Sequence, residues 1–195
     1  MTDALTPDEV KVRPQPTPNP HAIKFIINKP VKLEGKVSYR NDMDADGVPM
    51  VEDVFNLENI SQVFLFQNTM TVTHNGNWDN DELKSFVIPI IKTKLPEHDP
   101  SFKTQEELIE EKKKAKRKEL SPDLQEIEAI LDRTIRPGLR ADGGDIEIND
   151  YSHPELYVTF QGACGSCPSS TMGTLQAIQG ILAGEFKDDI EVIPE

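Results

Sequence analysis

The chain has few cysteines, few aromatic residues and no long apolar run. Among its 195 residues two are cysteine and 15 are proline, aromatic residues make up 6% and hydrophobic residues 36%. Without a run of about 18 apolar residues, no segment is expected to span a membrane. The low apolar content and the many prolines indicate two modest cores and some unstructured length.

Basic side chains are outnumbered by acidic ones. The chain has 21 Lys and Arg residues against 34 Asp and Glu residues, which gives a net charge of -13. Nucleic-acid affinity depends mostly on Lys and Arg that neutralise phosphates, and anionic membrane surfaces also attract basic segments. The negative net charge therefore argues against nucleic acids and membranes as partners, and we expect the partners to be other proteins.

The first residues, MTDALTPDEV, are acidic and polar. They resemble neither a secretory signal nor an arginine-rich transit peptide, so we expect a cytoplasmic protein. Thiols stay reduced in the cytosol, where a C-x-x-C pair is more often metal-binding or catalytic than structural.

The charges predict two small domains joined by a charged linker. Residues 101–120 carry 12 charged side chains and almost no apolar face. This composition is typical of a solvated linker, which can be helical because Glu110 and Lys114 have a favourable i,i+4 spacing. We predict a flexible N-terminal tail over 1–17, a first domain over 18–96, the linker over 97–120 and a second domain over 121–195.

The first domain is predicted to be a small mixed α/β domain. Apolar runs at 22–27, 63–66 and 70–74 indicate strands, and the last two form a hairpin. Residues 50–57 indicate a short helix. A longer amphipathic helix is expected to begin at an N-cap of Asp79 or Asn80, with Pro89 as a potential kink.

The second domain has the element order αββαβ, so the overall fold class is α/β (α+β). Ser121 is the expected N-cap of its first helix, which Pro137 and Gly138 are expected to end. Gly143 and Gly144 then form a turn into the first strand. The second strand is expected at 155–162, the second helix at 168–184 and the last strand at 189–194.

One acidic segment has the spacing of a calcium-binding loop. Asp42, Asp44, Asp46, Gly47 and Asp53 match the EF-hand pattern in part. However, Asp53 replaces the usual bidentate Glu, and Pro49 falls inside the loop. We therefore interpret the segment as an acidic surface loop. The four histidines are scattered without ligand-like spacing.

The two cysteines, Cys164 and Cys167, lie in the middle of an uncharged stretch. From Leu156 through Gly184 there are 29 residues without Asp, Glu, Lys, Arg or His. Pro168 suits the first position of a helix, which places Cys167 at the N-cap. A thiolate there has a lowered pKa, because the positive end of the helix dipole stabilises the anion.

Three chemistries fit this pair. A thiol–disulfide oxidoreductase also has C-x-x-C at a helix start, but only 28 residues follow Cys167, too few for the later strands of a thioredoxin-like fold. A structural zinc needs four ligands, so it would have to be shared across a dimer. In the third, an iron–sulfur cluster bridges two copies of the chain, and four thiolates complete a 4Fe–4S cluster. We adopt the third interpretation, an iron–sulfur cluster shared by two copies of the chain.

The sequence around the cysteines resembles the C-terminal domain of NifU-like proteins over about residues 123–194. The similarity combines R-P-x-L-x-x-D-G-G-D before two strands with G-A-C-x-x-C-P-S-S after them. The earlier half, from TPNPHAIKFIIN to GNWDNDELK, resembles the N-terminal domain of the Nfu type of this family. In this chain the N-terminal half carries an acidic segment at 40–49, where the resemblance implies a shorter loop.

The resemblance implies a non-enzymatic scaffold or carrier for iron–sulfur clusters. Such a protein holds a labile 4Fe–4S cluster at a homodimer interface, receives it from an upstream assembly scaffold and passes it to client apo-iron–sulfur proteins. Cys164 and Cys167 would be the cluster-binding residues, and a 2Fe–2S cluster would use the same thiolates. We expect Asp142 and Asp145 to be structural turn residues, with Arg136 and Arg140 ordering the turn or offsetting the cluster charge.

Overall fold

The computed structural model describes residues 5–104, 121–164 and 168–195. These residues form two compact units, Met1–Phe102 and Lys103–Glu195, each with its own hydrophobic core. Both units contain helices and strands, which confirms the α/β (α+β) class with two small domains. Residues 105–120 of the predicted linker lie outside the described residues, whereas its first residues, 97–102, belong to the first unit.

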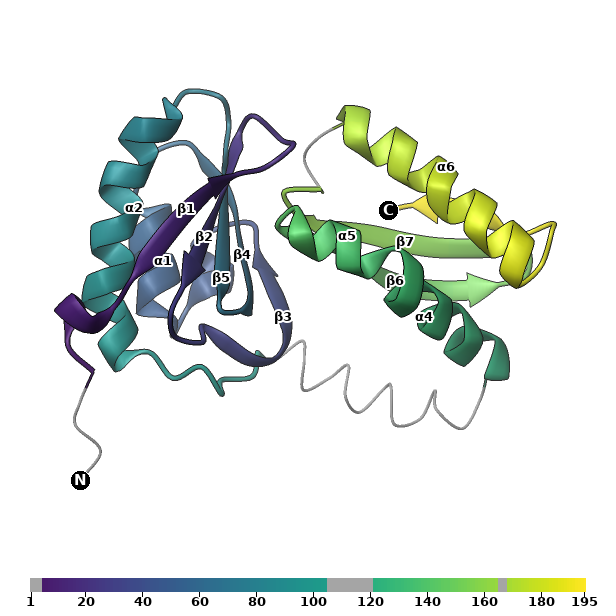
Figure 1. The fold of residues 1–195 in the computed structure, drawn as a ribbon, viewed down its shortest axis with the longest axis horizontal. Coiled ribbons are helices and arrows are strands. Elements are labelled where there is room, and N and C mark those ends of the chain that lie inside the picture. Colours follow the sequence, from purple (N-terminus) through teal and green to yellow (C-terminus); the bar gives the residue numbers. More distant parts are fainter. Residues whose placement is uncertain (1–4, 105–120, 165–167) are drawn as a thin grey trace. The chain divides into compact units, whose positions relative to one another are not determined.

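The first unit is built on a five-stranded antiparallel sheet with the strand order β1-β2-β5-β4-β3 (Figure 1). Strands β2, β4 and β5 contain the three predicted apolar runs, and β4 and β5 form the predicted hairpin. The strands are β1 (Val12–Pro16), β2 (Ala22–Ile27), β3 (Lys32–Tyr39), β4 (Ile60–Gln67) and β5 (Thr69–His74).

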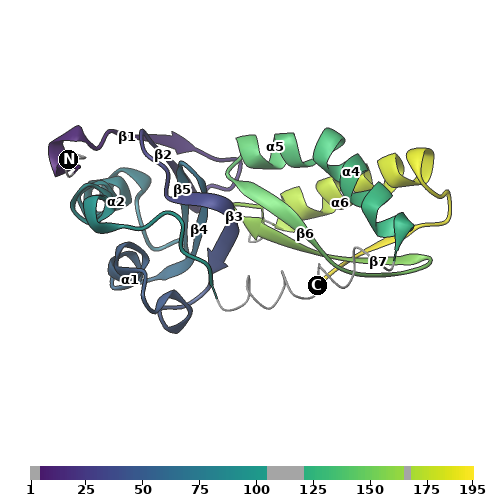
Figure 2. The same cartoon turned by 90° about the horizontal axis from the view of Figure 1, so that it is seen from below.

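Helices α1 (Pro49–Phe55) and α2 (Asn80–Lys94) pack on one face of this sheet (Figures 1 and 2). The Asp79 side chain accepts hydrogen bonds from the backbone N–H groups of Asp81 and Glu82, which confirms it as the N-cap of α2. Pro89 lies inside α2, as the sequence indicated. The buried stripe of α2 consists of Leu83, Val87 and Ile91.

Two strands of the first unit were not predicted. Strand β1 lies within residues 1–17, which we had expected to be a flexible tail, and it pairs with β2. It contains Pro14 and Pro16, which are typical of an edge strand because proline cannot donate to a neighbouring strand. Strand β3 forms the opposite edge, and its register shifts between Lys32 and Lys36. This irregular pairing explains why β3 lacks a clear alternating pattern.

The acidic loop forms a short capped turn that leads into α1. The Asp42 side chain accepts a hydrogen bond from the N–H of Met43, the first residue of the 3-10 helix Met43–Ala45. The Gly47 N–H donates to Glu52 Oε1 at 2.9 Å. Pro49 is the first residue of α1, where a missing N–H does not cost a hydrogen bond.

The second unit is a three-stranded sheet with helices α4, α5 and α6 on one face (Figures 1 and 2). Strands β6 and β7 pair antiparallel, and β8 is parallel to β7. The order αββαβ is confirmed, with α5 as an addition. The elements are α4 (Pro122–Thr134), α5 (Arg136–Ala141), β6 (Gly144–Ser152), β7 (Glu155–Gly162), α6 (Pro168–Glu185) and β8 (Glu191–Pro194).

The first helix of this unit begins as predicted but ends differently. The Ser121 hydroxyl accepts a hydrogen bond from the Leu124 N–H, which confirms the N-cap. Pro137 and Gly138 do not end the helical region; they lie inside α5, which follows α4 after Ile135. Proline is tolerated in the first turn of a new helix, so the chain becomes helical again after Ile135.

Each unit has a separate buried core. In the second unit, helices α4 and α6 contribute Ile127, Leu131, Ile178 and Leu182, which pack on the inner face of the sheet. Within the described residues, no helix is both long enough and apolar enough to traverse a lipid bilayer.

Candidate metal centre

Cys164 follows strand β7, and helix α6 begins four residues later at Pro168. Its side chain is half-buried and packs against the core of the second unit. The start of α6 at Pro168 confirms the predicted helix start. Cys167 lies outside the described residues, so its position at the N-cap stays a prediction.

The backbone beneath Cys164 is formed by glycines from two strands. Gly144, the first residue of β6, lies opposite Gly162 at the end of β7. The Ala163 N–H donates to the Gly143 carbonyl oxygen at 3.2 Å, which ties the two segments together. Gly143 and Gly162 have φ angles of 82° and 64°, which favour glycine. The D-G-G-D turn and the G-A-C segment thus form one structural unit around the cysteine.

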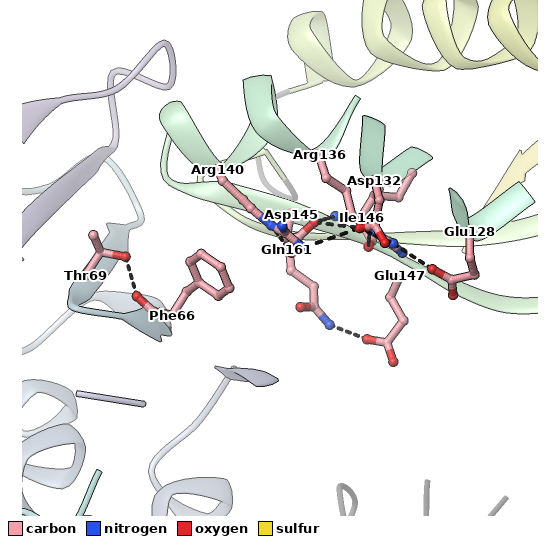
Figure 3. A network of polar contacts seen from close by, with 10 residues as sticks. All are labelled: Phe66, Thr69, Glu128, Asp132, Arg136, Arg140, Asp145, Ile146, Glu147 and Gln161. Atoms are coloured by element: carbon pink, nitrogen blue, oxygen red, sulfur yellow. Dashed lines mark hydrogen bonds and ion pairs between the residues drawn. The ribbon is translucent and has the colours of Figure 1, made fainter. Parts of the chain in front are cut away.

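Asp145, next to Gly144, is a fully buried carboxylate held by arginine (Figure 3). Its oxygens accept hydrogen bonds from the Ile146 N–H at 2.8 Å and from Arg140 Nε at 3.1 Å. Arg136 Nε forms a longer ion pair with it at 3.7 Å. The carboxylate is thus committed to internal contacts, as expected for a structural turn residue, and both arginines order the turn.

Arg136 links helix α4 to strand β6. Its Nη1 contacts Glu128 Oε2 at 2.6 Å and Asp132 Oδ1 at 2.9 Å, and its Nε donates to the Ile146 carbonyl oxygen at 3.4 Å. Burial by itself lowers the pKa of Arg136, but the hydrogen bonds and charges of Glu128 and Asp132 outweigh it and raise the pKa above its usual value. Arg136 is therefore a permanent cation within the unit.

Asp142 lies at the C-terminal end of α5 and is exposed, and its backbone N–H donates to the carbonyl oxygens of Gly138 and Leu139. This backbone role is consistent with a turn residue. Among the described residues, no group of three or more His, Cys, Asp and Glu side chains could hold a metal ion.

The uncharged stretch is partly buried and partly on the surface. Along β7, alternate residues are buried in the core. On α6, Ile178 and Leu182 are buried, whereas Met172 is 65% exposed. The uncharged stretch thus contributes both to the core and to the surface of the second unit. Gly144 was expected only as part of the turn into the first strand, and its close approach to Cys164 was not predicted.

Two family models match the chain in succession. The N-terminal domain of scaffold protein Nfu/NifU matches residues 12–98, and the NifU-like domain matches residues 127–193. The chain belongs to the Nfu type of the NifU-like family. The NifU-like domain covers Cys164, Cys167 and the arginine–aspartate contacts described above.

Individual relatives are similar over most of this chain. NifU-like protein 4, mitochondrial, from Arabidopsis thaliana is 30% identical over 178 residues, which cover 88% of this chain and 61% of that protein. NFU1 iron-sulfur cluster scaffold homolog, mitochondrial, from Homo sapiens is 29% identical over 183 residues, which cover 88% of this chain and 66% of that protein. The chain thus spans less than two thirds of the length of these relatives.

Among solved structures, a NifU-like protein from Saccharomyces cerevisiae covers 43% of this chain and 76% of its own chain, with 13% identity and a TM-score of 0.40. This similarity is too low to carry an argument.

The relatives contradict the expected cytoplasmic location, because the Arabidopsis and human proteins are mitochondrial. The expectation rested on the acidic and polar first residues, which resemble neither a secretory signal nor an arginine-rich transit peptide. The metal-binding interpretation of the C-x-x-C pair does not depend on it, because reduced thiols favour metal binding in any reducing compartment.

Proposed function

We propose that the chain is a non-enzymatic carrier of iron–sulfur clusters. It holds a labile 4Fe–4S cluster between two copies through Cys164 and Cys167, receives the cluster from an upstream scaffold and passes it to apo-proteins. The observation that carries the proposal is the position of Cys164 in a NifU-like domain, between the end of β7 and the start of α6. The name of the human relative, an iron-sulfur cluster scaffold homolog, supports it.

The requirement for two copies follows from the number of ligands. A 4Fe–4S cluster is held by four thiolates, and each chain offers two. The cluster is cargo rather than a resident cofactor, because each copy holds it by only two bonds. Cluster binding and dimer formation then become one linked equilibrium, and a client that supplies its own thiolates can displace the carrier.

The first unit contains no cysteine, so it is proposed to serve recognition rather than cluster binding. With the boundaries of the sequence analysis, residues 18–96 would select or dock client proteins. The charged linker at 97–120 would join this domain to the cluster-binding domain at 121–195.

Anaerobic reconstitution with ferrous iron and sulfide tests the proposal. We expect a brown chromophore, about two iron and two sulfide per chain, and a shift from monomer to dimer. Cys164→Ser and Cys167→Ser should each lose the chromophore and the dimer while keeping the far-UV circular dichroism of the parent. Ser152→Ala, which changes an exposed hydroxyl in the same unit, is the control and should reconstitute normally.

The alternatives give different results in the same experiment. A thiol–disulfide oxidoreductase would stay colourless and show a defined dithiol potential. A zinc site shared across a dimer would give a colourless dimer with about half a zinc ion per chain. Either result, or full cluster content in Cys167→Ser, would contradict the proposal.

A further inference from the structure

Gly144 lies directly under the side chain of Cys164. A Cβ atom added at Gly144 would lie 2.6 Å from Cys164 Sγ, 3.0 Å from Cys164 Cβ and 2.7 Å from the Gln161 carbonyl oxygen. Real Cβ atoms essentially never approach other atoms within 3.0 Å. The cysteine sulfur therefore occupies the space that any larger residue at position 144 would need.

Neighbouring glycines show that this restriction is specific to Gly144. Gly143 has a φ of 82°, so its backbone conformation explains the glycine, whereas Gly144 does not have a positive φ. A Cβ added at Gly138, Gly173 or Gly180 would have nothing within 4 Å. Gly144 thus has to be a glycine because of the atoms packed against it, the Cys164 side chain and the Gln161 carbonyl oxygen, and not because of its backbone conformation.

The backbone around Gly144 cannot easily move to relieve such a clash. Gly144 pairs with Gly162 in the ladder, and the Ala163 N–H is bonded to the Gly143 carbonyl oxygen. On the other side, Asp145 is anchored by Arg140 and by the Ile146 N–H. The added Cβ therefore strains the backbone at the Gln161 carbonyl oxygen, and the half-buried side chain of Cys164, which is freer to move than the backbone, is displaced.

We propose that Gly144 is a positioning residue, which holds open the space where the Cys164 sulfur sits and thereby sets the position of a cluster ligand. To move from 2.6 Å to the tight limit of 3.0–3.4 Å, the sulfur must shift by 0.4–0.8 Å. Metal–ligand distances tolerate only about 0.2 Å, so this shift is large enough to disturb a cluster. The cluster part of this inference rests on the proposed function.

The test compares Gly144→Ala with Gly138→Ala, an exposed glycine of the same unit with open space around it. In the iron-free protein carrying Cys167→Ser, Cys164 is the only thiol, and its rate of reaction with Ellman's reagent is measured. We expect Gly144→Ala to accelerate this reaction several-fold, because the sulfur is pushed out of its half-buried position. Gly138→Ala should react at the parental rate.

The reconstituted protein with both cysteines gives the second measurement. We expect Gly144→Ala to weaken cluster retention about 10- to 100-fold, as for residues that orient metal ligands, with Gly138→Ala unchanged. Parental thiol reactivity and cluster retention in folded Gly144→Ala would overturn the inference. If the parent protein binds no cluster, the proposed function fails, while the thiol reactivity still decides whether Gly144 positions the sulfur.

A thermodynamic cycle covers the case in which Gly144→Ala folds poorly. Replacing Cys164 with Ala removes the sulfur that lies 2.6 Å from the added Cβ. The loss in melting temperature caused by Gly144→Ala should therefore be smaller in a Cys164→Ala background than in the parent. An equal loss in both backgrounds would assign the clash to the Gln161 carbonyl oxygen and to the Cβ of residue 164, which alanine retains, and would overturn the inference.

Discussion

His74 and His98 are the two histidines of the first unit whose surroundings disfavour a positive charge. His74 is buried, and its Nδ1 accepts a hydrogen bond from the Gly76 N–H at 3.1 Å, which requires an unprotonated nitrogen. Burial lowers the pKa of His74, and the nearby His21 lowers it further, whereas the neighbouring Asn80 side chain raises it. Burial also lowers the pKa of His98.

These shifts predict that the first unit loses stability as the pH falls below about 6.5, the ordinary pKa of histidine. Below that value the unfolded chain binds protons at both histidines more readily than the folded chain, so protonation favours unfolding. Trp78, the single tryptophan, lies in the first unit, so its fluorescence in urea between pH 5 and pH 8 measures the effect. His74→Gln should flatten the pH dependence. The same change at His153, an exposed histidine of the second unit, should not.

Single residues of the site were predictable to different degrees. Cys164 could be proposed as a cluster ligand from its spacing to Cys167 and from the uncharged stretch around it, both of which are local in the sequence, and this role stays a prediction. The role of Gly144 could not, because it depends on the 19 residues between Gly144 and Cys164 folding back as a hairpin. Asp145 was interpreted as structural from its turn motif, with Arg136 and Arg140 as candidates to order the turn, and both arginines contact its carboxylate.

At the scale of elements, Arg136 holds helix α4 and strand β6 together through side-chain and backbone contacts. Its side chain is 8% exposed, whereas Glu128 and Asp132 are 38% and 58% exposed. Water therefore screens part of the attraction to these two carboxylates. The ion pair with the fully buried Asp145 is long, at 3.7 Å, and Arg140 still contacts that carboxylate. Removing Arg136 should therefore cost less than breaking a short, fully buried ion pair, for which about 3–5 kcal/mol is typical.

We expect Arg136→Met to destabilise the second unit by about 1.5–3 kcal/mol, the range for hydrogen bonds to charged groups. Arg136→Lys should have an intermediate effect, because it keeps the charge but loses the planar fork of donors. Urea unfolding followed by far-UV circular dichroism measures the change. The Trp78 fluorescence transition reports on the first unit and should stay at its parental midpoint; a shift of this transition would mean that the effect is not confined to the second unit.

Elements with strong local signals were predicted, and those determined by sheet edges were not. Helix α2 has an N-cap at Asp79 and apolar residues at helical spacing, so its start could be predicted. Its buried face could be predicted in part, because Leu83, Val87 and Ile91 are buried whereas Phe86 in the same pattern is exposed. Strands β1 and β3 lie at the two edges, where prolines or an irregular register remove the alternating pattern. The end of α4 was misjudged because Pro137 is equally compatible with ending one helix and with starting the next.

At the scale of the whole chain, the cysteines and the tryptophan belong to different units, and each unit has its own core. We therefore predict that a fragment of residues 121–195 folds and binds the cluster with the same iron content per chain as the full protein. A fragment of residues 1–104 should fold without binding iron. Iron and sulfide analysis after anaerobic reconstitution checks both fragments. A folded 121–195 fragment that cannot be reconstituted would show that the first unit takes part in cluster binding.

Strand β1 has a consequence for the behaviour of the protein at high concentration. An open sheet edge exposes unpaired N–H and C=O groups, onto which a strand from another molecule can add. Two of the five residues of β1, Pro14 and Pro16, have no N–H group to offer. This edge is therefore a poor template for intermolecular β-sheet growth. The same two prolines that made β1 unrecognisable as a strand in the sequence also protect this edge against aggregation.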